Sequence, residues 1–339
     1  MKKKILGILI LSIFFFTGCG AKNDDIIQKL KDKVKKLDSY QINGLLEVTN
    51  NETTYKYDIN VAYKKNELYR VSLKNKTNNH EQIILKNQDG VYVLTPALNK
   101  SFKFQSEWPY SNSQSYLYQT IINDIENDDN VKIDPKKDGY IITTKVNYSN
   151  NKDLVNQKIY LDKNANINKV EVMDKSGIVK IRMKYQKVTN NKDFDNNYFE
   201  LSSNIDINKL NDEKNNNQQN DEEKEKTASK LFDISYPLYI PDNTKLTSQD
   251  TTELGRTILT FAGDKSFVII EEASSLNDDY ETISVNGELE FVNDVIGTIS
   301  DGTVSWTSNG VEYYAASDSM DTTELLEVVN SMNTVTVGK

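Results

Sequence analysis

The most constraining pattern in this sequence is an alternation of apolar and polar residues that runs from residue 39 to about residue 187. In residues 55–63 every second position is Tyr, Ile or Val, and this period of two is typical of a β-strand with one buried face. Turns rich in Asn and Asp separate the runs, which predicts a long antiparallel meander. A sheet with so many strands must curl or be covered. The shorter runs are residues 68–73, 82–85, 91–95, 140–146, 158–161, 169–173 and 178–185.

One helical segment interrupts the strands. Residues 114–126 place Leu117, Ile121 and Ile125 four residues apart, which is the spacing of one helix face. Trp108 and Pro109 open the loop before this segment. We expect the helix to lie across the curved sheet and cover its apolar face.

An earlier amphipathic helix is expected to begin at Asp24. Its apolar residues recur every three or four positions up to Leu37, with lysines between them, and its first turn is acidic, as helix N-termini favour. This helix could pack on the following sheet or lie on a membrane surface. We prefer packing on the following sheet to an orientation on a membrane surface.

Aromatic and aliphatic side chains gather around the covering helix. We favour their use as core filling, and the alternative is the mouth of an apolar groove that holds a ligand. The candidate groove or core residues are Phe102, Phe104, Trp108, Tyr116, Leu117, Tyr118, Ile121 and Ile125.

The first nineteen residues carry an export signal. Three lysines precede an apolar run over residues 5–16, and Cys19 follows closely. The run has twelve residues, well short of the roughly 20 that a membrane span needs. The segment resembles a bacterial lipoprotein signal, with Phe16 in place of the usual Leu. The resemblance implies removal of residues 1–18, a diacylglyceryl or acyl lipid on Cys19, a tether over residues 19–23, and a location on the outer face of the cytoplasmic or forespore membrane.

Charge and cysteine content exclude several classes of function. The formal charge is −9, and loss of the three signal lysines makes the mature chain more acidic. An acidic body is unsuited to nucleic acid and to anionic lipid surfaces. Cys19 is the only cysteine, so its lipidation leaves neither a disulfide nor a thiol nucleophile.

A second domain is expected after a polar linker. Residues 208–230 are rich in Asn, Gln, Asp, Glu and Lys, which predicts disorder and two bodies that move and melt independently. Within residues 231–339, Asp321 is placed to cap a closing helix, and Asn309-Gly310 is a hairpin-turn signal. Strands are expected at residues 257–261, 267–271, 303–307 and 311–315.

Catalytic and metal motifs were sought and not found. His80 is the only histidine, and a zinc site or a Ser-His-Asp triad would depend on it alone. The run after Asp162 mimics a calcium loop, but Ile167 and Met173 stand where that loop needs Gly and Glu. We therefore expect no catalytic residue, no metal, no cofactor other than the lipid on Cys19, and no enzymatic activity.

Residues 24–207 resemble the LolA-like (lipoprotein carrier) superfamily. The signal, the leading helix, the meander, Trp108-Pro109 and the helix at 114–125 carry the likeness, together with residues 160–163 and 169–174. It is nearest to the sporulation lipoproteins of YdcC type and the clostridial germination lipoproteins. The fold implied is α+β: a strongly curved antiparallel half-barrel covered by helices, followed by a smaller α+β domain. Residues 302–332 resemble the DUF4367 domain of the sporulation proteins.

The resemblance implies a function without catalysis. Our first hypothesis is a lipoprotein that docks or assists a cell-envelope partner, such as a cortex amidase, in spore formation or germination. The alternative is a carrier that binds a lipid or lipoprotein in a groove of the half-barrel. The anchor argues against a shuttling carrier, because a fixed protein cannot cross between membranes and a Gram-positive spore former has no outer membrane to supply.

Overall fold

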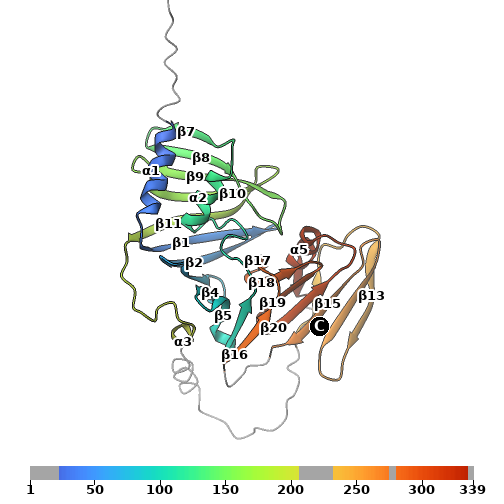
Figure 1. The fold of residues 1–339 in the computed structure, drawn as a ribbon. Coiled ribbons are helices and arrows are strands. Elements are labelled where there is room, and N and C mark those ends of the chain that lie inside the picture. The colour runs from blue at the N-terminus through green and yellow to red at the C-terminus, as the bar shows by residue number, and fades with distance from the viewer. Residues whose placement is uncertain (1–22, 206–231, 275–279, 335–339) are drawn as a thin grey trace, which may run out of the picture.

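The described residues form two large, mainly antiparallel sheets of unequal size, a two-stranded ribbon and a few helices (Figure 1). In the computed structural model the described residues are 23–205, 232–274 and 280–334. This is the α+β architecture that the sequence predicts. Cys19, the signal, the tether up to residue 22 and the whole linker at residues 208–230 lie outside these ranges, so the domain boundaries expected near them stay predictions. Asn23, the last residue of the expected tether, is the first residue of a helix.

The larger sheet has twelve strands in the order β16-β6-β5-β4-β3-β2-β1-β11-β10-β9-β8-β7. Neighbouring strands are antiparallel except β16 and β6, which run parallel. Its edge strands are β16 and β7, so the sheet stays open as a half-barrel. Its strands are β1 (Ser39–Asn50), β2 (Thr53–Lys64), β3 (Leu68–Asn75), β4 (Glu81–Asn87), β5 (Gly90–Thr95), β6 (Lys100–Phe104), β7 (Lys132–Lys136), β8 (Gly139–Lys145), β9 (Leu154–Asp162), β10 (Ile167–Asp174), β11 (Val179–Asn190) and β16 (Glu281–Val285).

A glycine in β1 marks an irregularity in the larger sheet. The register with β11 shifts between Asn43 and Gly44. A Cβ atom at Gly44 would lie 2.4 Å from the carbonyl oxygen of Lys184, so only glycine allows this approach. Such bulges bend a strand and increase its twist, which helps the sheet to curve.

Two helices cover one face of the larger sheet, α1 (Asn23–Lys35) and α2 (Tyr118–Glu126). Ile26 and Leu30 of α1 are buried with strand residues in the main core, which supports the packed placement of this helix. The sequence predicts that the second helix begins at residue 114, but α2 begins at Tyr118. Residues 114–117 form a turn instead, in which the Thr120 hydroxyl accepts the Gln114 N–H and donates to the Gln114 carbonyl. Among the helices of the described ranges, none has the length and apolar content of a membrane span.

The smaller sheet has seven strands in the order β13-β14-β15-β20-β19-β18-β17. Helix α5 (Thr322–Asn330) packs on it and begins as predicted, because the Asp321 carboxylate accepts the Glu324 N–H at 2.9 Å. Asn309 and Gly310 both have positive φ, as a two-residue hairpin turn requires. The strands are β13 (Thr244–Thr251), β14 (Thr257–Gly263), β15 (Phe267–Ala273), β17 (Glu288–Val292), β18 (Val295–Ser300), β19 (Thr303–Ser308) and β20 (Val311–Ala316). A separate ribbon pairs β12 (Ser235–Pro237) with β21 (Met332–Thr334). Two short helices complete the described elements, η1 (Pro96–Leu98) and α3 (Leu201–Asn204).

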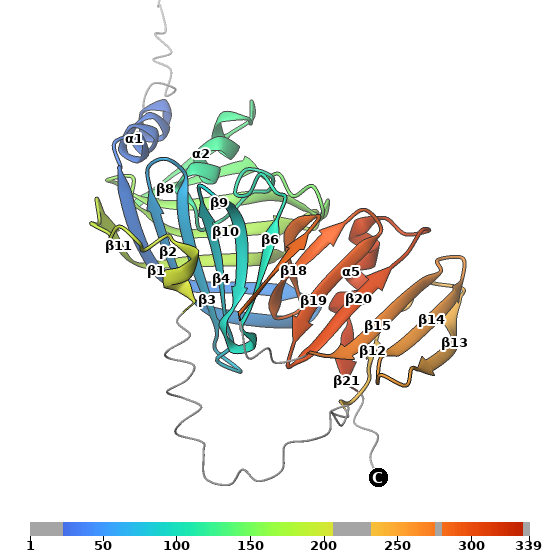
Figure 2. The ribbon, with the colours of Figure 1, turned by 60° about the horizontal axis from the view of Figure 1, so that its bottom comes forward.

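The two parts of the chain share an interface. Strand β16 comes after the linker in sequence, yet it pairs with β6 over five residue pairs. Leu289 of β17 and Ile296 of β18 are buried in the same core cluster as the helices and strands of the half-barrel. The expectation of two independent bodies is therefore wrong for these elements, because part of the second sheet's surface is buried against the first (Figure 2).

Candidate functional site

The residues singled out as groove or core lie mainly in the core. Phe102 is half-buried and packs against the main hydrophobic cluster of the half-barrel. The predicted lipidation residue, Cys19, lies outside the described ranges. Trp108 contacts Tyr69 edge to face, with ring centroids 5.7 Å apart. The candidates that are buried in the main hydrophobic cluster of the half-barrel are Phe104, Trp108, Tyr116, Leu117, Tyr118, Ile121 and Ile125. The structure thus brings seven of the eight into one packed cluster.

The second part of the chain packs against the half-barrel's core. Leu289 and Ile296 are buried there, and Phe291 packs against the cluster, with its ring 5.8 Å from that of Tyr57. A cavity of about 30 Å³ remains between these residues and Trp108. That volume holds about one water molecule. The sequence did not predict this filling, because residues far apart along the chain provide it.

Polar contacts hold the two parts together. The Gln82 side chain accepts the Ile296 N–H at 2.6 Å and donates to the Ile296 carbonyl at 3.1 Å. Lys100, buried on β6, contacts the Glu312 carboxylate on β20. A buried cation must be paired to avoid a large desolvation cost. Gln82 and Lys100 therefore fix the position of the second sheet, although neither carries a recognisable motif.

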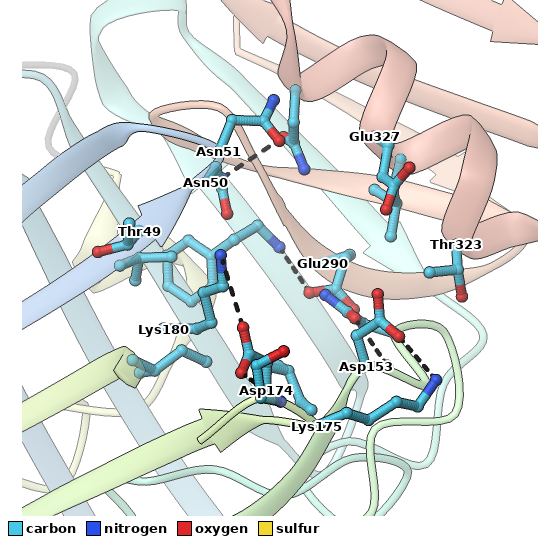
Figure 3. A pocket seen from close by; sticks show the side chains of 18 residues that line it. Thr49, Asn50, Asn51, Asp153, Asp174, Lys175, Lys180, Glu290, Thr323 and Glu327 are labelled. Atoms are coloured by element: carbon cyan, nitrogen blue, oxygen red, sulfur yellow. Dashed lines mark hydrogen bonds and ion pairs between the residues drawn. The ribbon is translucent and has the colours of Figure 1, made fainter. Parts of the chain in front are cut away.

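A polar cavity of about 310 Å³ opens at one end of the interface (Figure 3). Its walls come from the β1–β2 and β10–β11 turns, the loop before β9, β17 and α5, with side chains such as Asp153, Lys180 and Glu327. Lys175 pairs with Asp153 at 2.7 Å, and Lys180 lies 3.9 Å from Asp174. Burial first, and then the carboxylate of Asp153, raises the pKa of Glu327.

Glu290 of β17 lines both this polar cavity and the small inner one. The residue as a whole is partly exposed, but its Oε2 oxygen is buried without a hydrogen-bond partner among the described residues. Its Oε1 oxygen accepts the Phe291 N–H at 3.1 Å. Burial raises the pKa of Glu290 to about 7, because desolvation penalises the charged carboxylate.

A second cleft, which we call the edge cleft, lies between the edge of the half-barrel and the second sheet. Its volume is about 390 Å³. One wall is formed by Phe102 and Phe104 of β6 with Ile283 and Val285 of β16, and the other by residues of β15, β18, β19 and β20 that include Tyr314. The exposed fraction of Tyr314 is 40%. Two residues of the predicted groove, Phe102 and Phe104, line the edge cleft.

Glu290→Gln is expected to stabilise the fold at neutral and higher pH. A carboxyl whose pKa rises on folding binds more protons in the folded state, so its contribution is lost as pH rises from about 4.5 through about 7. A neutral amide removes this loss. We expect the free energy of unfolding to exceed that of the wild type by about 1–3 kcal/mol at pH 8 and to match it near pH 4. Urea denaturation at both pH values measures the difference, and an equal gain at both would show that Glu290 does not titrate as described.

Among the described residues, the titratable groups considered for catalysis are not brought together. His80 is exposed in the turn before β4. Asp124 also has a pKa raised to about 7 by burial, but its oxygens accept hydrogen bonds from Ser113 and Gln157 within the core. Within the described ranges, no group of three or more potential ligands could hold a metal ion.

Comparison with known proteins places the chain in a family. A family model described as "Sporulation protein YdcC-like" matches residues 1–199. Sporulation protein YdcC of Bacillus subtilis (strain 168) is 33% identical over 330 residues, which cover 95% of this chain and 94% of that protein.

Two solved structures show weaker similarity. A putative outer membrane lipoprotein-sorting protein domain from Vibrio parahaemolyticus is 13% identical with a TM-score of 0.33, over 54% of this chain and 98% of that one. The CwlD amidase from Clostridioides difficile in complex with the GerS lipoprotein gives 18% identity and a TM-score of 0.26, over 57% of this chain and 99% of that one. The family itself rests on the sequence matches: the chain belongs to the sporulation protein YdcC-like family.

Proposed function

We propose that this chain is a membrane-anchored lipoprotein without catalytic activity that docks or assists a cell-envelope protein during spore formation or germination. The sporulation role is supported by its similarity to YdcC of Bacillus subtilis over nearly the whole of both chains. The anchor is the lipid on Cys19, and the partner is an amidase-type enzyme of the spore cortex or another envelope protein. The lipid would hold the body on the outer face of the cytoplasmic or forespore membrane.

One observation carries the choice of docking over transport. A carrier needs space for an acyl chain within the curved sheet, and ligand pockets generally measure about 300–1,000 Å³. Here Leu289 and Ile296 of the second sheet join α1 and α2 in the core, and about 30 Å³ remains beside those two residues. The pocket between α1, Tyr118 and the sheet measures about 250 Å³, which is below that range. A carrier would have to expel its own second sheet from this position, against the contacts of Gln82 and Lys100.

The carrier remains the alternative because of the edge cleft. Its volume of about 390 Å³ falls at the low end of the range for ligand pockets, and Phe102 and Phe104 line it. Its walls also include the Arg256–Glu272 ion pair at 2.7 Å, a polar feature that an alkyl chain does not use.

Co-purification separates the two functions. The lipidated chain is isolated in mild detergent from sporulating cells, and bound proteins and extracted lipids are measured by mass spectrometry. We expect one envelope protein in near-equal amount and no lipid in near-equal amount beyond the covalent anchor. The same purification from cells that are not sporulating is the control. A stoichiometric free lipid without a protein partner would favour the carrier.

A further inference from the structure

The four edges of the two sheets differ in their protection against a further strand. Native sheets guard exposed edges with proline, lysine, bulges or covering elements. Strand β7 contains Pro135 between Lys132 and Lys136. Strand β13 has an irregular register between Leu246 and Ser248, and β17 has Leu289 buried in the main core.

Strand β16 differs from these three edges in its sequence and its register. Its five residues, Glu281–Val285, contain no proline or lysine, and its pairing with β6 runs without a shift. It is the last strand of its sheet, so its outer side carries no strand within the described ranges. An edge without such protection is suited to pairing with a strand from another chain.

The outward backbone groups of β16 can be identified from its inward ones. The Glu281 N–H donates to the Asn99 carbonyl at 3.0 Å, and the Val285 carbonyl accepts the Gln105 N–H at 3.4 Å. Residues 281 and 285 therefore direct these groups toward β6. Because parallel pairing uses alternate residues of a strand, Thr282 and Ser284 direct their N–H and C=O groups outward. Both residues are exposed.

The edge cleft lies beside this free edge. Ile283 and Val285 of β16 are half-buried and line it, facing Tyr314 of the second sheet. In strand addition, main-chain hydrogen bonds give affinity and pockets for alternate side chains give specificity. The free edge provides the hydrogen bonds and the cleft provides room for apolar side chains.

The charge of the chain selects the kind of partner. The formal charge is −9 before removal of the basic signal, and Glu281 stands at the start of the free edge. Like charge opposes a second copy of this chain, whereas a basic segment is attracted. We propose that an extended, basic segment of a partner protein adds as a strand to β16 and places apolar side chains in the edge cleft. This inference rests on the proposed docking function and names its surface.

Ser284→Pro tests the main-chain part of the proposal. Proline removes the outward N–H of residue 284 and places its ring on the free side, while the bonds to β6 remain. The probe is a fluorescent synthetic decapeptide that alternates Val or Ile with Lys or Thr. By fluorescence anisotropy we expect the wild type and the matched control Ser284→Ala to bind it alike, and Ser284→Pro to bind at least about tenfold more weakly.

Changes in the probe keep the test valid if Ser284→Pro loses stability. A decapeptide with alternate N-methylated amides cannot complete the ladder, and one with Glu in place of Lys carries the wrong charge. Both should bind the wild type at least about tenfold more weakly. Equal binding of all peptides, or no binding of the basic one, would overturn the proposal.

Failure of this test and failure of the docking function give different results. If the co-purified partner is retained by Ser284→Pro, the docking function stands and the free edge of β16 is the wrong surface. If no protein partner is found but the basic decapeptide binds the edge, the surface stands and its cellular role is wrong.

Discussion

Leu117→Ala is expected to lower the free energy of unfolding by about 2–5 kcal/mol, the range for removing a leucine from a packed core. Leu117 is fully buried and directly precedes α2. Its carbonyl accepts the Ile121 N–H at 3.2 Å, a backbone contact that alanine keeps. The loss therefore reports side-chain packing. Urea denaturation of the purified soluble body measures it.

Leu254→Ala is the matched control for this prediction. It is the same chemical change at a leucine whose exposed fraction is 84%, so it should alter the free energy of unfolding by less than about 0.5 kcal/mol. If Leu117→Ala left stability unchanged but abolished binding of a lipid or a partner, Leu117 would line an open groove and the core interpretation would be wrong.

Local patterns predicted most of the half-barrel. Alternate residues of β2 and β9 are buried on one face of a continuous sheet, and this burial leaves a period of two in the sequence. The N-cap at Asp321 and the hairpin turn at Asn309 could also be predicted, because each depends only on residues within a few positions of it.

The interface between the half-barrel and the second sheet could not be predicted from the sequence. Strand β16 has only five residues, and its partner β6 lies about 180 residues earlier in the chain. The residues that fill the half-barrel from the second sheet, Leu289 and Ile296, look like ordinary core residues of their own sheet. A contact of this kind depends on tertiary packing, which no local pattern encodes.

The candidate site was predicted only in part. Phe102 and Phe104 were recognised as groove or core residues, and both line the edge cleft. Its opposite wall and the unpaired oxygen of Glu290 were missed, because a glutamate among 50 acidic residues gives no signal until its burial is known. The contribution of Gln82 was missed for a similar reason, since its hydrogen bonds join residues 214 positions apart.

The nearly filled core and the proposed lipid anchor together favour a protein that acts at one place. In that proposal the lipid on Cys19 links the body to the membrane. The short tether of residues 19–23 would then hold the body close to the membrane, since a fully extended chain gains only about 3.5 Å per residue.

Cys19→Ala is accordingly expected to move the protein from the membrane fraction to the soluble fraction almost completely. Each buried CH₂ of an acyl chain contributes about 0.8 kcal/mol, and more than one chain makes the anchor stable. The net negative charge of the chain opposes attraction to an anionic membrane in its place. Metabolic labelling with a radioactive fatty acid, followed by membrane fractionation, measures both the lipid and the location.

The matched control for this experiment is Ser12→Ala, which changes the apolar run of the signal but keeps Cys19. It should be labelled and membrane-bound like the wild type. Label on Cys19→Ala equal to that of the wild type would disprove lipidation at this residue. An unlabelled Cys19→Ala protein that stays with the membrane would point instead to the alternative placement of α1 on the membrane surface, although Ile26 and Leu30 are buried against the sheet. We expect the unlabelled Cys19→Ala protein to leave the membrane fraction, because one face of α1 is buried and the body is acidic.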